Sequence, residues 1–227
     1  MKKQAQAAKK AWVTIRKNLG FSHNVLVPNV KGLYDYSQSE RKETKVRPEV
    51  VNACRNLPKG NEPILSLTSN QCLQELAIIG AGIKAIFHSV EADLNTFHLL
   101  LLNAKKYGWM FDETKKRSKG FLSTITFGKA ASIIYTATAN SFRTMLLDYC
   151  GSIKTFGPEI AHAISNDLVK KGGFIYITLC QRAAGMDTQK QVYDLVRKAG
   201  GGRYRIEFEA GYRDSAPMYS AVIRRVK

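Results

Sequence analysis

Cysteine and histidine are scarce in this sequence and are not arranged for chemistry. The 227 residues include four cysteines and four histidines. No cysteines have Cys-x-x-Cys spacing, and no histidines have the spacing of a metal-binding pair. This argues against a disulfide framework and against a zinc site. We therefore expect no bound metal and a reducing intracellular compartment, either the cytoplasm or, in a eukaryotic source, the nucleus.

Long apolar runs are also missing. The basic N-terminus lacks the apolar core of a signal peptide, and no apolar run is long enough to cross a bilayer. We therefore expect no membrane partner. The hydrophobic content of 44% is nevertheless ordinary for a globular protein. The length suits one α/β domain with a substantial core and is short for two.

Acidic residues are few beside basic ones. The chain has 18 Asp and Glu against 35 Lys and Arg, which gives a net charge of +17. Such a charge repels itself unless a polyanion is near, so RNA or DNA is the leading partner class. An anionic membrane surface and association with ribosomes are the alternatives. The basic residues cluster near the N-terminus and in Lys115–Lys119, a pattern typical of a phosphate-binding surface, although solvated faces look the same.

The chain divides into two parts by composition. Residues 1–19 have the apolar spacing of a basic helix, and residues 20–45 are polar and rich in turn residues. A short helix follows from Arg47, because proline at position 48 suits a first helical turn. We predict a basic N-terminal extension over residues 1–60 and a folded domain over residues 61–227.

Strands and helices alternate from Pro63 onward. The segment 130–141 is predicted as a helix, although its β-branched residues also suit a strand. Two strands of alternating polarity end the chain and are predicted to pair antiparallel. The predicted strands cover residues 64–68, 84–90, 121–127, 144–148, 173–179, 204–209 and 218–226, and the predicted helices cover residues 70–80, 94–107, 130–141, 158–171 and 188–199.

This order of elements, with Asp148 at the tip of a central strand and a hairpin at the end, resembles the class I S-adenosylmethionine-dependent methyltransferase family. The resemblance covers about Pro63 to Lys227 and rests on the order of elements rather than on a signature string. It implies an α/β, Rossmann-like sandwich with a mostly parallel seven-stranded sheet and an antiparallel terminal hairpin. It also implies S-adenosylmethionine as the cofactor, lying across the carboxyl ends of the first, second and fourth strands.

The same resemblance implies which residues bind the cofactor. The turn after the first strand usually carries glycines in the family, whereas this chain has small hydroxyl and amide residues at a helix N-terminus. Glu91 would accept two hydrogen bonds from the ribose hydroxyls, with Asp93 as the alternative. The third strand ends without the usual acid that contacts adenine. The implied set is Leu67, Thr68, Ser69, Asn70, Gln71, Glu91, Ala92, Gly128, Lys129 and Asp148.

Three residues at the end of the fourth strand are the predicted catalytic residues: Asp148, Tyr149 and Cys150. They stand where family members that methylate exocyclic amines carry an Asp/Asn-Pro-Pro-Tyr type sequence, and Asp148-x-x-Gly151-Ser152 is similar to the Asp-Pro-Phe-Gly-Ser stretch of tRNA guanine-N2 methyltransferases. This chain has none of the prolines of either stretch. The resemblance implies that Asp148 holds the target amine and that Tyr149 stacks on the base. Cys150 is similar to the nucleophile of RNA cytosine-C5 methyltransferases, although a free cysteine is more often a packing residue.

The sequence therefore predicts a methyltransferase that acts on a base nitrogen of RNA or DNA. Few titratable groups are needed, because the sulfonium is already activated and positioning dominates. The alternative is a non-catalytic nucleic-acid-binding protein on a degenerate methyltransferase fold, which the glycine-free first turn favours. A nicotinamide-dependent reductase is less supported, since Gly80-Ala81-Gly82 follows a helix rather than a strand. The loosened motifs would suit a viral or phage enzyme, and the oligomeric state is not predicted.

Overall fold

A seven-stranded sheet organises the molecule. The computed structural model describes residues 42–68, 73–106, 123–149, 151–181, 187–213 and 216–227. The strand order is β3-β2-β1-β4-β5-β7-β6; the first five strands run parallel, and β7 pairs antiparallel with both β5 and β6. The strands are β1 (Ile64–Leu67), β2 (Phe87–Glu91), β3 (Ser123–Phe127), β4 (Thr144–Asp148), β5 (Phe174–Cys180), β6 (Tyr204–Arg213) and β7 (Pro217–Arg225).

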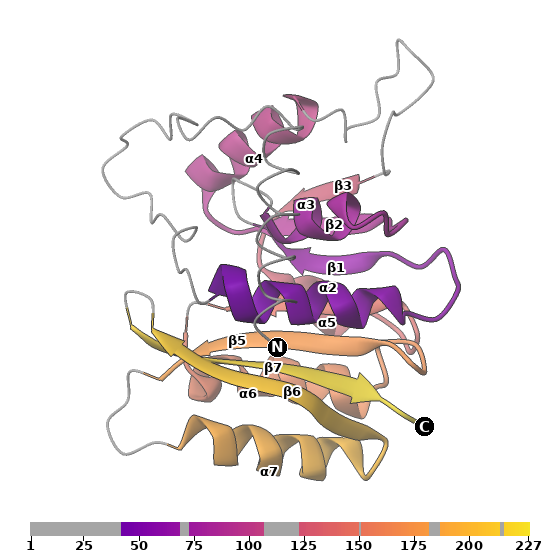
Figure 1. Ribbon diagram of the computed structural model, residues 1–227, viewed down its shortest axis with the longest axis vertical. Helices are drawn as coiled ribbons and strands as arrows, with labels where there is room; N and C mark the ends of the chain where they lie inside the picture. Colours follow the sequence, from indigo (N-terminus) through magenta and orange to yellow (C-terminus); the bar gives the residue numbers. More distant parts are fainter. Residues whose placement is uncertain (1–41, 69–72, 107–122, 150, 182–186, 214–215) are drawn as a thin grey trace.

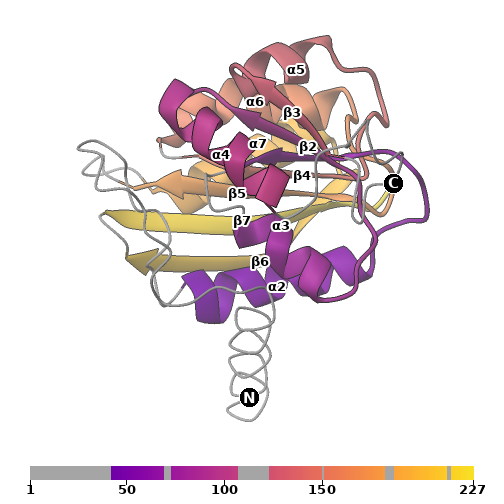
Figure 2. The same ribbon diagram turned by 90° about the horizontal axis from the view of Figure 1, so that it is seen from above.

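Helices cover both faces of this sheet (Figures 1 and 2). α2 and α3 pack on one face, α5, α6 and α7 pack on the other, and α4 packs against α3 and β3. A π-helical turn, η1, leads directly into α2. The bounds are η1 (Lys42–Val46), α2 (Arg47–Arg55), α3 (Leu73–Gly80), α4 (Leu94–Lys106), α5 (Ala130–Thr136), α6 (Ile153–Ser165) and α7 (Thr188–Gly200).

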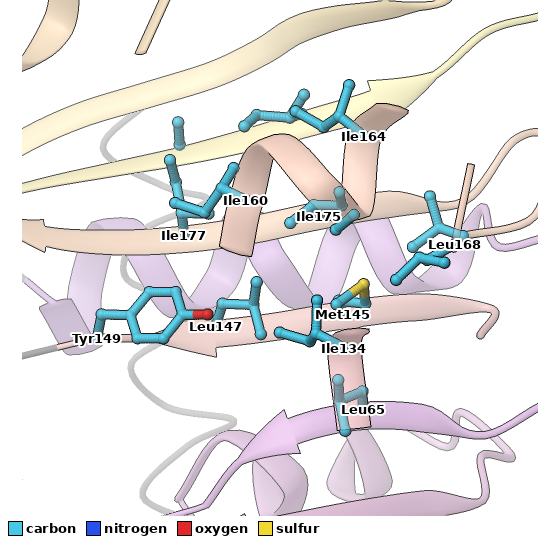
Figure 3. Packing of buried hydrophobic residues seen from close by; sticks show 14 of the residues in the cluster. Leu65, Ile134, Met145, Leu147, Tyr149, Ile160, Ile164, Leu168, Ile175 and Ile177 are labelled. Atoms are coloured by element: carbon cyan, nitrogen blue, oxygen red, sulfur yellow. The ribbon is translucent and has the colours of Figure 1, made fainter. Parts of the chain in front are cut away.

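Successive side chains of the central strands enter opposite layers of the core. On the α5–α7 side, Met145 and Leu147 of β4 pack with Ile175 and Ile177 of β5 (Figure 3). The residues between them face α2 and α3. All seven residues of β5 are buried. This is the pattern expected of parallel strands that are covered on both faces, which read as continuous apolar runs.

The helix α2 belongs to the core. Val46, Val50 and Cys54 are almost fully buried and pack in the same cluster as Leu146 and Phe174 of the central strands. The division of the chain at residue 60 stays a prediction, and residues 1–41 lie outside the described residues. Residues 42–55, however, supply buried side chains to the same core as the sheet.

The predicted fold class is confirmed, including the antiparallel terminal hairpin. The predicted strand 144–148 is observed with the same bounds. Asp187 caps α7 as expected, because its side chain accepts a hydrogen bond from the Lys190 amide at 3.0 Å. The segment 130–141 begins as a helix, not as a strand, but ends at Thr136, where a turn closed by Thr138 and Ser141 takes over.

The predicted start of the helix at Pro158 is wrong. α6 begins at Ile153, so the proline lies in its second turn, where it costs the helix one backbone hydrogen bond. The buried residues Ile153, Gly157, Ile160 and Ile164 explain the outcome, because they form one apolar stripe along the whole helix. The periodicity of burial therefore outweighed the local preference of proline.

Two strand boundaries differ by three residues or more, for reasons that lie in the neighbouring strands. β2 begins at Phe87 instead of residue 84, because its partner β1 begins opposite it at Ile64. β6 continues to Arg213 instead of residue 209. A register shift between Ile206 and Phe208 interrupts the simple alternation that the sequence pattern relied on.

The role of α2 in the core is testable with Val50→Ala. The side chain of Val50 is fully buried, so we expect the substitution to lower the free energy of unfolding by about 1–3 kcal/mol through lost burial and a cavity. Urea unfolding of both proteins measures the difference. Asn52→Ala, at an exposed position of the same helix, is the control and should change it by less than about 0.5 kcal/mol. Equal effects of the two variants would contradict the packing of α2.

Candidate active site

The sheet brings the ends of β1, β2, β3 and β4 to one edge. Leu67 pairs with Val90 and Glu91 pairs with Phe127, so these three strands end side by side. β4 lies on the other side of β1 and ends at Asp148. The chain thus winds outward from β1 in one direction and then returns to wind in the other. In open α/β sheets this switch point is where ligands bind, outside the carboxyl ends of the strands.

Glu91 is held at this edge by backbone groups. Its Oε1 accepts a hydrogen bond from the Asp93 amide at 2.7 Å, and its main-chain oxygen accepts one from the Gly128 amide at 2.9 Å. Burial raises the pKa of Glu91, although the amides of Asp93 and Ala92 oppose the rise. Gly128 has a φ of +148°, and a Cβ added to it would meet no atom of the described residues within 4 Å. No described residue therefore fills the space directly beside Gly128.

The alternative acid, Asp93, has a structural task instead. Its Oδ1 accepts a hydrogen bond from the Thr96 amide at 2.8 Å, in the first turn of α4. This is the bond of a helix N-cap. The ribose-binding role of Glu91, with Asp93 as the alternative, stays a prediction. The neighbouring Ala92 and Lys129 are exposed, and Leu67 packs against the α5–α7 core.

A buried carboxyl group lies beneath the end of β1. Glu75 of α3 is 2% exposed, and its Oε1 accepts hydrogen bonds from Ser66 Oγ at 2.5 Å and Thr68 Oγ1 at 2.6 Å. Burial raises the pKa of Glu75, although these hydroxyls and Arg47 oppose the rise. The Thr68 hydroxyl is thus engaged within the protein. Ser69, Asn70 and Gln71 lie outside the described residues.

Asp148 forms an ion pair that no sequence pattern indicated. Its Oδ2 lies 2.5 Å from Nζ of Lys42, in the turn η1; the side chains of Asp148 and Lys42 are 33% and 10% exposed. Burial lowers the pKa of Lys42, but the combined attraction of Asp148, Tyr176 and Tyr212 outweighs it and the pKa is raised. The sequence shows only that Lys42 stands shortly before a predicted helix, which does not identify Asp148 as its partner.

Hydroxyl groups continue this polar region below the ion pair. The hydroxyl of Thr178 lies 2.7 Å from that of Tyr176 and 3.1 Å from that of Ser220. All three residues are almost completely buried. Buried polar groups are costly unless they are hydrogen-bonded, and these satisfy one another.

Tyr149 points to the opposite face of the sheet from Asp148. It is 4% exposed, its ring stacks on Phe156 at a centroid distance of 4.0 Å, and its hydroxyl donates to Glu159 Oε2 at 2.7 Å. A Cβ at Gly151 would lie 2.5 Å from the Phe156 ring, so this stacking requires glycine there. The base-stacking role of Tyr149 stays a prediction and would require the ring to leave Phe156. Cys150 lies outside the described residues.

The described residues contain neither a metal-binding cluster nor a membrane-spanning helix. No group of three or more His, Cys, Asp or Glu side chains within the described ranges could hold a metal ion. No helix in the described part of the chain is long and apolar enough to span a membrane.

Comparison with known proteins shows similarity in structure but not in sequence. No protein-family model matches the chain, and no curated protein matches its sequence. A Haemophilus influenzae protein provisionally named a methylase is 11% identical, with a TM-score of 0.55 over 81% of this chain and 89% of its own. A Clostridium thermocellum protein provisionally named an rRNA methylase is 10% identical, with a TM-score of 0.51 over 79% and 95%.

A third similar structure is the precorrin-6y C5,15-methyltransferase of Geobacter metallireducens. It is 13% identical, with a TM-score of 0.50 over 80% of this chain and 88% of its own. Identities this low establish the fold alone. The chain therefore has the class I, Rossmann-like methyltransferase fold that its order of elements predicted.

The buried carboxyl group of Glu75 gives a prediction about pH. Because the pKa of Glu75 is raised in the folded protein, its carboxyl group keeps a proton that it loses at about pH 4.3 in the unfolded chain. The stabilisation from this group is therefore complete below that pH and is lost as the pH rises to the folded pKa. We expect wild type to lose stability relative to Glu75→Gln over this range, as measured by urea unfolding at a series of pH values.

The exposed carboxylate of Glu49 in α2 provides the matched control. Glu49→Gln should follow the pH dependence of wild type. Stability curves of wild type and Glu75→Gln that stay parallel at every pH would show that Glu75 does not carry the raised pKa.

Proposed function

We propose that this chain is an S-adenosylmethionine-dependent methyltransferase that modifies a base nitrogen of RNA or DNA. The observation that carries the proposal is the pair of carboxylates at the switch point of the sheet. Glu91 ends β2 and Asp148 ends β4, on opposite sides of β1. One carboxylate can hold a cofactor on its side of the switch point, while the other holds an acceptor.

The residues at the end of β2 fit the ribose of the cofactor. A carboxylate accepts hydrogen bonds from two neighbouring hydroxyls, and Glu91 is fixed by the Asp93 amide beside the space at Gly128 that no described residue fills. The Thr68 hydroxyl is engaged by Glu75, so the methionine end would depend on backbone amides of the turn that follows. When bound, S-adenosylmethionine supplies an activated methyl group on its sulfonium.

The environment of Asp148 fits the acceptor. Its Oδ2 is held by Lys42, and Oδ1 accepts no hydrogen bond from the part of the chain that the structure describes. Oδ1 can therefore accept an N–H bond from an amine at the sheet edge. Such a bond would fix the direction of the nitrogen lone pair, which is the positioning that transfer from an activated donor requires. No protein side chain need carry a proton during the transfer itself.

The charge of the chain supports a nucleic-acid acceptor. A net charge of +17 favours binding of a polyanion by neutralising phosphates. The similar Clostridium thermocellum structure, provisionally named an rRNA methylase, points in the same direction. The basic side chains within residues 1–41 of the extension and Lys115–Lys119 are proposed as the phosphate contacts, and both segments lie outside the described residues.

One observation favours the second candidate, a nucleic-acid-binding protein without catalysis. The first turn contains no glycine between Leu67 and Cys72, and the Thr68 hydroxyl points to Glu75. A hydroxyl group that donates its hydrogen bond to a buried side chain stabilises the fold, and this role does not require a bound cofactor. Cofactor binding separates the two candidates.

The cofactor site is tested by calorimetric titration with S-adenosylmethionine and with S-adenosylhomocysteine. We expect Glu91→Ala to weaken both by about 30-fold or more, because hydrogen bonds to a charged group contribute about 1.5–3 kcal/mol each. Glu49→Ala, which removes an exposed carboxylate from α2, should leave affinity unchanged. Absence of binding by wild type, repeated with RNA and with DNA present, would leave the non-catalytic candidate.

The acceptor site is tested by transfer of a tritiated methyl group to unmodified RNA transcripts and, separately, to unmodified duplex DNA. Asp148→Asn should lower the rate by about 100-fold, since one misplaced contact at a reacting centre has an effect of this order. Asparagine keeps an oxygen for Lys42 but not the negative charge. Cofactor affinity should therefore be unchanged, while the melting temperature should fall by roughly 2–5 °C because the buried ammonium loses its charged partner. Asp194→Asn, in α7, is the control. An unchanged rate would remove Asp148 from the mechanism.

A further inference from the structure

The ion pair between Lys42 and Asp148 joins the start of the described chain to the strand end that carries the proposed acceptor site. The two residues are 106 positions apart, and Nζ and Oδ2 are separated by 2.5 Å. Their exposures are unequal, because the lysine side chain is 10% exposed and the aspartate side chain is 33% exposed. The ammonium therefore approaches the carboxylate from the interior, and the carboxylate is the partner that reaches solvent.

Neighbouring elements and side chains hold this ion pair in place. η1 contacts both α2 and β6, and Val46 at the end of the turn is 1% exposed. Tyr176 and Tyr212 lie close enough to act electrostatically on Lys42, as does Arg47 from the next turn. A buried ammonium needs a paired charge, because an isolated one is strongly disfavoured in the interior. Asp148 supplies that charge.

We propose that Lys42 is a positioning residue for methyl transfer: it fixes one oxygen of Asp148 from below, so that the other faces the acceptor amine. This proposal rests on the proposed function. A carboxylate at a strand end can turn about its side-chain torsions, and the ion pair at Oδ2 restricts that turning.

The same ion pair gives a residue that precedes the predicted domain a part in the proposed site. Lys42 directly follows residues 1–41, a segment rich in lysine, and its turn η1 continues into the buried helix α2. The Asp148 carboxylate, which would accept a hydrogen bond from the acceptor amine, is thus oriented by Lys42. This residue precedes the alternating strands and helices that begin at β1. The proposed division of the chain at residue 60 would separate Asp148 from this partner.

The first test compares three lysine variants in the tritium-transfer assay with unmodified RNA and duplex DNA. Lys42→Met removes the charge but keeps the length, and Lys42→Arg keeps the charge. Lys45→Met, three residues away at an exposed position, is the matched control. We expect Lys42→Met to lower kcat by about 10- to 100-fold, Lys42→Arg to recover part of the loss, and Lys45→Met to stay within about twofold of wild type.

Two readouts separate positioning from general damage. Calorimetric affinity for S-adenosylmethionine should be unchanged in Lys42→Met, because Glu91 binds elsewhere on the edge. In an Asp148→Asn background, Lys42→Met should change the residual rate by less than about threefold, because residues that act through one another are not additive.

A third readout does not depend on activity. Asp148→Ala leaves the Lys42 ammonium buried without its carboxylate, so we expect the melting temperature to fall by about 5 °C or more. The double variant Lys42→Met/Asp148→Ala removes the orphaned charge and should recover most of that loss. A double variant that melts below Asp148→Ala would overturn the ion pair itself.

The outcomes distinguish the two proposals. If wild type transfers methyl groups and Lys42→Met is as fast, the positioning role is wrong while the proposed function stands. If Lys42→Met is faster, the lysine competes with the acceptor amine, which also overturns positioning. If wild type neither binds S-adenosylmethionine nor transfers methyl groups, the proposed function fails and the positioning role fails with it, whatever the melting experiment shows.

Discussion

Coverage of the parallel strands on both faces is the constraint on which the rest of this structure depends. A parallel sheet is stable only when helices exclude water from both of its sides, and here the two layers of helices bury every residue of β5. Polar chemistry is then confined to the strand ends. β4 shows the change within two residues, because Leu147 is completely buried and Asp148 reaches solvent. The carboxyl edge is therefore where a functional site can form.

The polar groups that do enter the interior are concentrated on the face covered by α2 and α3. Glu75 accepts hydrogen bonds from two hydroxyl groups beneath β1, and Thr178 of β5 forms hydrogen bonds with Tyr176 of the same strand and Ser220 of β7. Each of these groups is hydrogen-bonded to a partner from another element or to a residue two positions away on the same strand. Such networks are unforgiving of substitution, because removal of one member leaves the others buried without partners. They give the site edge a rigid foundation.

Much of the fold could be predicted because it depends on local periodicity. The bounds of β4 and the cap of α7 at Asp187 were predicted correctly from neighbouring residues. The failure at Pro158 has the same origin, since a local preference was allowed to outweigh the spacing of Ile153, Ile160 and Ile164. The positions of Glu91 and Asp148 at strand ends could be predicted from the extent of the strands. Lys42 and Glu75 could not, because their partners come from contacts between elements that no spacing encodes.

The position of β7 between β5 and β6 has a consequence for synthesis of the chain on the ribosome. β6 is made first, but the edge of β5 pairs only with β7, which is made afterwards. A nascent chain that has already emerged through β6 still carries an apolar, unpaired edge along β5. Unpaired edges of this kind are templates for association with other chains. The interval before β7 emerges is thus when the growing polypeptide is most exposed to misassembly and most dependent on chaperones.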